Sequence, residues 1–363
     1  MALLPLVGHL EARQRLAQAF SGGKLPQLLL LTGPSGVGKQ RLALWLGQLL
    51  LCDQPGAEPC GSCRPCHQVL GLAHPDLHWF MPIPRPKAGE PGKQMEEAEE
   101  LIGEKLAARR ENPLYGRPDG LEGHFVTTAR LLHRVAGKTP AQGKRKVLIV
   151  GDAERLVPQE ASPEAANALL KLFEEPAANT QLILTASTVE GMLPTIRSRA
   201  VRLRLARLAD GDVREFLQAH LEPAPAGAAL EERVARAEGA IGAALDEESG
   251  GAKAVQAAHT LLEAVVGTTG NPAELALKQG TWAARGEFTE MLDALAATLM
   301  DAARVSAGHP PRRPLPPVLA RRGNPAAYAA ALDRVMMARF AARQNVNPQL
   351  LLAVLGDELA EVL

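Results

Sequence analysis

The sequence has few aromatic residues and no net charge. Phe, Trp and Tyr make up 3% of its 363 residues, and 40 Lys and Arg are balanced by 40 Asp and Glu. Proteins that hold single-stranded nucleic acid without sequence preference stack its bases on aromatic side chains in a basic groove. The composition therefore argues against a free-standing nucleic-acid binder, and it implies that any contact with DNA is local or shared with other subunits.

Long hydrophobic runs are also missing. A helix that crosses a bilayer needs about 20 consecutive apolar residues, whereas the run Leu28–Leu31 is followed at once by a glycine-rich loop. Residues Met1–Leu10 lack a basic leader, so they do not have the pattern of a signal peptide. We expect a cytoplasmic protein that has no membrane partner.

Cysteine is scarce and falls in one short stretch. The chain has 4 cysteines, at positions Cys52, Cys60, Cys63 and Cys66. In a reducing compartment such clustering indicates a metal site and not disulfides. Four thiolates at short spacing suit tetrahedral Zn²⁺ and leave no open position for catalysis, so we predict a structural zinc ion.

Two other uses of these cysteines were weighed. The segment Cys63–His67 matches the C-x-x-C-H pattern of c-type haem attachment, but haem would leave Cys52 and Cys60 without a role and would require export. An iron–sulfur cluster could use all four thiolates. The spacing favours zinc and leaves the iron–sulfur alternative open.

The hydrophobic pattern predicts an α/β domain followed by helices. Apolar runs of strand length alternate with segments of helical periodicity, which is typical of a mostly parallel sheet covered on both faces. The expected strands are Gln27–Leu31, Leu77–Met81, Val147–Val150, Gln181–Thr185 and Ala200–Leu205, and the expected helices are Leu10–Phe20, Arg41–Leu51, Thr127–Val135 and Pro163–Glu175. From Asp210 onward the pattern is helical to the end.

Two segments interrupt this pattern. Residues 82–123 are rich in Pro, Gly and charge, so we expect a solvated, partly mobile surface insert with one charged helix around Met95–Arg110. Lys144–Lys146 reads as a basic turn before the strand Val147–Val150.

A phosphate-binding loop follows the first strand. Its sequence Gly33-Pro34-Ser35-Gly36-Val37-Gly38-Lys39 fits the pattern G-x-x-x-x-G-K between a strand and a helix. In such a loop the glycines let backbone N–H groups face phosphate oxygens, and the lysine adds a positive charge. ATP or ADP is therefore a candidate ligand.

The metal and water positions beside this loop are altered. Gln40 stands where a Ser or Thr hydroxyl would bind Mg²⁺. After the strand Val147–Val150, Gly151 and Asp152 stand where two acids would hold the metal and orient the attacking water. At most one of those two groups remains, so we predict that any bound nucleotide is not hydrolysed efficiently.

The order of motifs resembles the clamp-loader family of AAA+ ATPases, and most closely its delta-prime members. The resemblance rests on Val7–His9, the phosphate loop, the cysteine cluster, Ala165–Pro176, Leu193–Arg199 and Asn345–Leu350. It implies a P-loop AAA+ domain with a parallel sheet over residues 1–206, which contains a zinc module at 52–66 and the variable insert at 82–123. A small helical lid domain at 207–250 and an all-α collar domain at 251–363 that mediates oligomerisation would follow.

The resemblance also implies roles for single residues. In that family the arginine of the Ser198-Arg199 turn reaches a neighbour's γ-phosphate, so Arg199 would be an arginine finger acting in trans. By itself, Arg199 belongs to a basic run with Arg197, Arg202 and Arg204, and the residues alone favour a surface arginine. A polar sensor would be Ser187 or Thr188, whereas Gly242 stands where a sensing arginine is expected.

The function implied by the resemblance is that of a partner subunit. It would belong to the DNA polymerase III holoenzyme, have neither polymerase nor efficient ATPase activity itself, and help gamma/tau and delta subunits load the sliding clamp on primed DNA. The alternative is an active gamma/tau-type ATPase, which the intact Gly33–Lys39 loop supports. The Pro-rich loop His309–Pro317 is expected to lie outside the collar contact.

Overall fold

The computed structural model describes residues 3–112, 122–156, 164–189, 191–245, 251–267, 270–279, 285–320, 324–342 and 346–363. They divide into two compact units, one of Met1–Ala226 with Ala237–Leu245 and one of Gly227–Arg236 with Asp246–Leu363. The division into three domains with borders at 206 and 250 stays a prediction.

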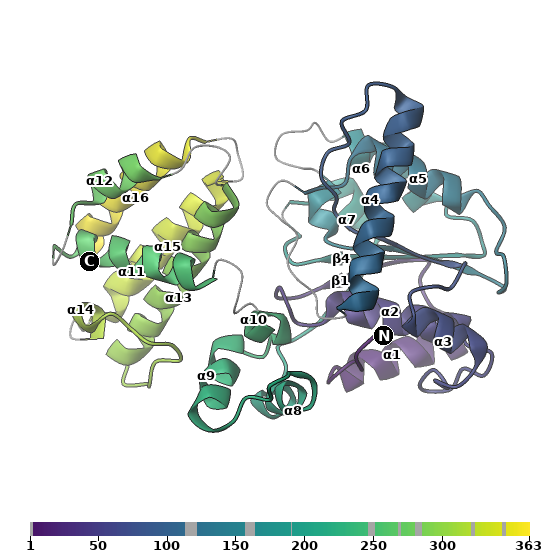
Figure 1. Cartoon of the computed structure of the whole chain (residues 1–363), viewed down its shortest axis with the longest axis horizontal. Helices are drawn as coiled ribbons and strands as arrows, with labels where there is room; N and C mark the ends of the chain where they lie inside the picture. Colours follow the sequence, from purple (N-terminus) through teal and green to yellow (C-terminus); the bar gives the residue numbers. More distant parts are fainter. Residues whose placement is uncertain are drawn as a thin grey trace. The chain divides into compact units, whose positions relative to one another are not determined.

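The first unit is built on a five-stranded parallel sheet in the order β2-β3-β4-β1-β5 (Figure 1). The strands are β1 (Leu28–Thr32), β2 (Leu77–Phe80), β3 (Lys146–Val150), β4 (Thr180–Ala186) and β5 (Val201–Arg204). The three inner strands are buried along their whole length. Their continuous apolar runs fit this position, because a parallel sheet is covered on both faces.

Helices cover both faces of the sheet (Figure 1). Leu29 and Leu31 of β1 pack in the core formed with the helices α1 (Leu10–Ser21), α2 (Lys39–Leu51) and α3 (Arg64–Leu70). Leu28 and Leu30 point to the opposite core, as the period of two in a strand requires. The helices of that second face are α4 (Pro91–Glu111), α5 (Val126–Ala136), α6 (Glu164–Glu174) and α7 (Pro194–Arg199).

These elements confirm the α/β prediction, with borders that differ by a few residues. One error concerns Lys146, which was expected in a basic turn but belongs to β3 and is 2% exposed. Its Nζ donates to the carbonyl oxygens of Val135, Ala136 and Lys138 at the end of α5. A buried ammonium group is tolerated there because carbonyls at the end of a helix lack the N–H partner four residues on that carbonyls in its interior have.

The insert at 82–123 is more ordered than its composition suggests. The expected charged helix is present as α4 and is longer than expected. Its Ala98 is fully buried, and Met95, Leu101 and Ile102 pack against the same core as α5 and α6. This part of the insert is therefore a packed layer and not a solvated excursion; residues 113–121 lie outside the described ranges.

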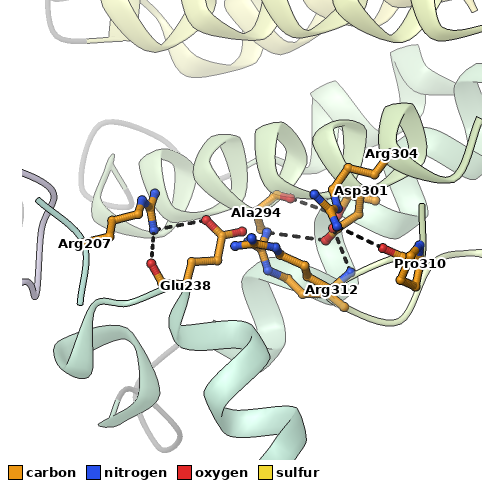
Figure 2. A network of polar contacts seen from close by, with 9 residues as sticks. Arg207, Glu238, Ala294, Asp301, Arg304, Pro310 and Arg312 are labelled. Atoms are coloured by element: carbon orange, nitrogen blue, oxygen red, sulfur yellow. Dashed lines mark hydrogen bonds and ion pairs between the residues drawn. The ribbon is translucent and has the colours of Figure 1, made fainter. Parts of the chain in front are cut away.

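Three short elements complete the first unit: the 3₁₀ helix η1 (Ala153–Leu156), α8 (Asp210–His220) and α10 (Ile241–Leu245). The chain before α8 is joined to the chain before α10 by Arg207, whose guanidinium donates to the Glu238 carbonyl at 2.6 Å and pairs with its carboxylate at 3.1 Å (Figure 2). Leu208 donates its N–H to the Gly239 carbonyl at 2.8 Å. These contacts fix where α10 begins.

The described part of the second unit is helical, as predicted. Its long helices are α11 (Gly251–Val265), α13 (Arg285–Ser306), α15 (Pro325–Ala342) and α16 (Pro348–Val362), and its shorter ones are α12 (Pro272–Lys278) and α14 (Pro317–Ala320). The helix α9 spans Gly227–Ala237. Leu292, Val335 and Leu359 lie in the core that these long helices share. None of the described helices has the length and apolar character needed to cross a membrane.

The Pro-rich loop His309–Pro317 is tied to α13. The Asp301 carboxylate on that helix accepts the Arg312 N–H at 3.0 Å and pairs with Arg313 at 3.8 Å, and the Arg304 side chain donates to the Pro310 carbonyl at 3.4 Å (Figure 2). Whether this loop lies outside a collar contact stays a prediction. Asn345 of the C-terminal motif lies outside the described residues.

Candidate functional site

The phosphate loop lies between β1 and α2, where the sequence predicts it. Gly33, Gly36 and Gly38 have φ angles of 154°, 76° and 100°, which only glycine adopts without strain. Lys39 is the first residue of α2. The loop therefore has the backbone of a phosphate cradle at the start of a helix.

Lys39 makes contacts inside the loop. Its Nζ donates to the carbonyl oxygens of Gly33 at 3.0 Å and Pro34 at 2.8 Å, and to Ser187 Oγ at 3.0 Å. The side chain is buried, at 5% exposure. Ser187, one of the two predicted sensor positions, thus lies at the ammonium group that would meet a phosphate.

The helix α10 packs against the same loop. Gly242 on α10 donates its N–H to the Gly36 carbonyl at 3.0 Å. The two backbones are so close that a Cβ on Gly36 would lie 2.9 Å from Gly242 Cα. The position where an arginine is expected therefore holds a glycine that lets α10 rest directly on the loop.

His9 covers another part of the loop. Its Nε2–H donates to the Val37 carbonyl at 2.7 Å. Burial lowers the pKa of His9, and the hydrogen bond to the Val37 carbonyl opposes this shift because a charged ring can donate it as well. The Val7–His9 motif thereby contacts the phosphate loop through two residues, His9 and Val37, that are 28 positions apart in the sequence.

The position of the Mg²⁺ ligand is taken by an amide. Gln40 Nε2 donates to Asp152 Oδ2 at 3.0 Å. A Cβ added to Gly151 would lie 3.0 Å from Gln40 Oε1, so the missing side chain at 151 provides the space for the longer side chain at 40. The two departures from an active site are therefore complementary.

Sequence reasoning missed Glu154 as a member of this site. Glu154 Oε1 accepts the Ser187 N–H at 2.9 Å, and Oε2 is sealed from solvent without a hydrogen-bond donor among the described residues. Burial, and then the charge of Asp152, raise the pKa of Glu154 to about 7. Its place two residues after Asp152, just past a buried strand, is the signal that could have identified it.

Arg199 is the last residue of α7, next to the edge strand β5. Its Nη2 lies 2.6 Å from Glu174 Oε1, and its Nη1 donates to the Thr195 carbonyl at 2.9 Å. Its side chain is 36% exposed. These contacts lie on α6 and α7 and not on the phosphate loop, so the structure does not bring Arg199 to this chain's own cradle.

The four cysteines converge. Their sulfurs all lie within 4.8 Å of one another, and both the Cys60–Cys66 and the Cys52–Cys63 pairs are 3.9 Å apart. Zn–S bonds of about 2.3 Å at tetrahedral angles place neighbouring sulfurs about 3.8 Å apart. The cluster has the size and donor set to hold a zinc ion.

A glutamate joins the cysteine loop to the helical layer beneath it. Glu58, between Cys52 and Cys60, accepts the Trp45 indole N–H at 2.6 Å and pairs with Arg13 at 3.2 Å. Trp45 lies on α2, the helix that starts at Lys39. The cysteine module is therefore fixed to the same helix as the phosphate loop.

Comparison with known proteins identifies the family. Residues 8–209 match the family described as "DNA polymerase III, delta subunit". The chain is 30% identical to the DNA polymerase III subunit delta' of Haemophilus influenzae over 51% of this chain and 44% of that protein. It is 32% identical to that of Pseudomonas aeruginosa, over 48% and 41%.

A gamma subunit is also similar. The DNA polymerase III subunit gamma of Buchnera aphidicola is 26% identical over 59% of this chain and 47% of that protein. The chain spans less than half the length of the curated relatives it matches. Because the family match covers more than half of the chain, this protein belongs to the DNA polymerase III delta-subunit family.

Proposed function

We propose that this chain is the delta-prime subunit of a bacterial clamp loader, a partner that does not hydrolyse ATP efficiently. It would assemble with gamma/tau and delta subunits, place Arg199 against a neighbour's nucleotide, and help load the sliding clamp on primed DNA. The names of its relatives support the assembly, and the geometry of its own nucleotide site supports the division of labour.

The hydrogen bond between Gln40 and Asp152 carries the proposal. Hydrolysis needs a hydroxyl and an acid to hold Mg²⁺ and a second acid to orient water. Here the amide of Gln40 donates to one carboxylate oxygen of Asp152, Oδ2, and Gly151 offers no side chain. The loop could still bind the phosphates of ATP or ADP, because its glycines and Lys39 are present.

Arg199 supports the other half of the proposal. A guanidinium offers forked donors to phosphate oxygens and stabilises the charge that develops in phosphoryl transfer. Arg199 is partly exposed at the end of α7, and its contacts with Glu174 and Thr195 do not involve its own loop. A neighbouring subunit could therefore reach it, whereas its own nucleotide could not.

The second unit offers a surface for partner subunits. Met336, Met337 and Phe340 on α15 are 47%, 68% and 61% exposed, although the opposite side of the same helix is buried. A helix with apolar residues on all sides is typical of one that is covered by other protein. We assign this surface to the collar contact with the related subunits.

The decisive experiment compares the isolated chain with the assembled complex. Alone, it should show negligible Mg²⁺-dependent turnover, whereas a rate on the order of 1 per second would favour a gamma-type motor. In a complex with its gamma/tau and delta partners, Arg199→Ala should depress ATPase activity and clamp loading. Arg197→Ala, on the same helix, is the matched control and should leave both unchanged.

We further propose that Cys52, Cys60, Cys63 and Cys66 hold structural Zn²⁺. The convergence of the sulfurs and the anchoring by Glu58 support this. Metal analysis of colourless purified protein should give one equivalent of zinc, and a chelator should lower the melting temperature. A brown protein that contains iron would contradict the assignment.

A further inference from the structure

An ion pair between Arg199 and Glu174 connects the motif Leu193–Arg199 with the motif Ala165–Pro176. Glu174 is the last residue of α6, and Arg199 is the last residue of α7. Both ends are held by the core: Phe173, next to Glu174, and Ile196, one turn before Arg199, are 3% and 1% exposed in the same cluster. Packing therefore sets the backbone positions from which the carboxylate and the guanidinium extend.

Two acceptors hold the guanidinium of Arg199. Glu174 Oε1 binds Nη2 at 2.6 Å, and the Thr195 carbonyl accepts from Nη1 at 2.9 Å. A guanidinium has five N–H donors, and each terminal nitrogen carries two of them. Each of the two arms can thus be anchored and still present an N–H to a phosphate oxygen.

We propose that Glu174 is the positioning residue of Arg199. Its carboxylate, together with the Thr195 carbonyl, fixes the plane of the guanidinium before a neighbour's phosphate arrives. This inference rests on the proposed role of Arg199 in trans. Its physical basis is that a small error in the placement of a catalytic group has a large effect on rate, whereas an unanchored arginine samples many rotamers.

The two residues that follow Glu174 help to separate its role from that of a general acidic charge. Pro176 follows the two acids Glu174 and Glu175 and stops the helix, so Glu174 is the last residue of α6. Glu175 is also acidic and exposed, but the ion pair to Arg199 is made by Glu174. Glu175→Gln is therefore a control that removes the same charge from the adjacent position.

The test measures ATPase kinetics of the assembled complex with variants of this subunit. We expect Glu174→Ala to lower kcat by about threefold to tenfold with little change in KM, since it disturbs geometry and not nucleotide affinity. Glu174→Gln keeps an oxygen acceptor and should stay within about twofold of the wild type. Glu175→Gln should match the wild type.

A double variant separates positioning from general damage. If Glu174 acts through Arg199, then Glu174→Ala with Arg199→Ala should be no slower than Arg199→Ala alone. Additive losses, or wild-type kinetics for Glu174→Ala beside a slow Arg199→Ala, would overturn the inference and leave the role of Arg199 intact. Full activity of Arg199→Ala would instead overturn the role in trans.

Discussion

The phosphate loop and the end of α7 each carry a cationic side chain suited to phosphate, Lys39 and Arg199, but the two side chains differ in burial. Lys39 is buried and donates to the loop's own carbonyls and to Ser187, and the loop is covered by Gly242 and His9. Arg199 lies at the end of α7, just before the edge strand β5, and is partly exposed with one carboxylate beside it. A phosphate must replace internal contacts to reach Lys39, whereas Arg199 can be approached from outside.

The largest expected effect comes from the contact that covers the loop. Gly36→Ala combines a positive φ with a Cβ 2.9 Å from Gly242 Cα, so it should lower the free energy of unfolding by about 2 to 5 kcal/mol. Gly23→Ala has a similar φ, 64°, in open space and should cost only about 1 to 2 kcal/mol. Urea titration of both variants measures the difference. Equal losses would mean that α10 does not rest tightly on the loop.

The next effect concerns the replaced metal site. Gly151→Asp alone crowds Gln40 and places a second acid beside Asp152, so we expect a loss of about 1 to 3 kcal/mol. Adding Gln40→Thr removes the crowding and supplies a hydroxyl, so the double variant should recover stability in Mg²⁺ and bind nucleotide more tightly when Mg²⁺ is present. Titration of a fluorescent ATP analogue with and without Mg²⁺ tests this. A double variant that is as unstable as Gly151→Asp would show that the two positions are not complementary.

A smaller, pH-dependent effect is expected from Glu154. Its pKa rises from 4.5 to about 7 on folding, so the folded state holds the proton more tightly. Stability should therefore fall as the pH rises from about 4.5 to about 7 and then level off. Glu154→Gln stays neutral, so urea titrations should show a shallower slope in this window and a gain over the wild type above it. An unchanged slope would mean that Glu154 does not carry the buried proton.

These regions also differ in how far the sequence predicts them. The phosphate loop, its strand and its helix follow from glycine spacing and a local change of hydrophobic period, and the altered metal position is visible as Gln40 and Gly151. The contacts of the loop with Ser187 and Gly242 depend on strand order and on the return of a distant helix, which no local pattern encodes. Lys146 was wrongly assigned to a basic turn for the same reason: the carbonyls it binds lie at the end of α5 and just beyond it.

The contact between Arg199 and Glu174 is a second example of a feature that local sequence patterns do not predict. The turn that contains Arg199 and the helix that ends at Glu174 are each recognisable, and a resemblance gives Arg199 a role. Their contact requires that α6 and α7 pack side by side on one face of the sheet, which depends on tertiary structure. Packing also explains why the charged helix α4 is ordered, since Ala98 is buried in the core and Met95, Leu101 and Ile102 pack against it.

The smallest expected effect on stability is at Arg199 itself. Both members of its ion pair are more than a third exposed, and such pairs contribute about 0 to 1 kcal/mol. Arg199→Ala should therefore unfold in urea within about 1 kcal/mol of the wild type and of Arg197→Ala, although it impairs the complex. A loss well above that range would mean that Arg199 supports the fold, and its effect on ATPase could no longer be attributed to a phosphate contact. A small loss would instead show that the Arg199 side chain, unlike the covered phosphate loop, contributes little to folding. That is the result expected if Arg199 serves to contact a neighbour's nucleotide.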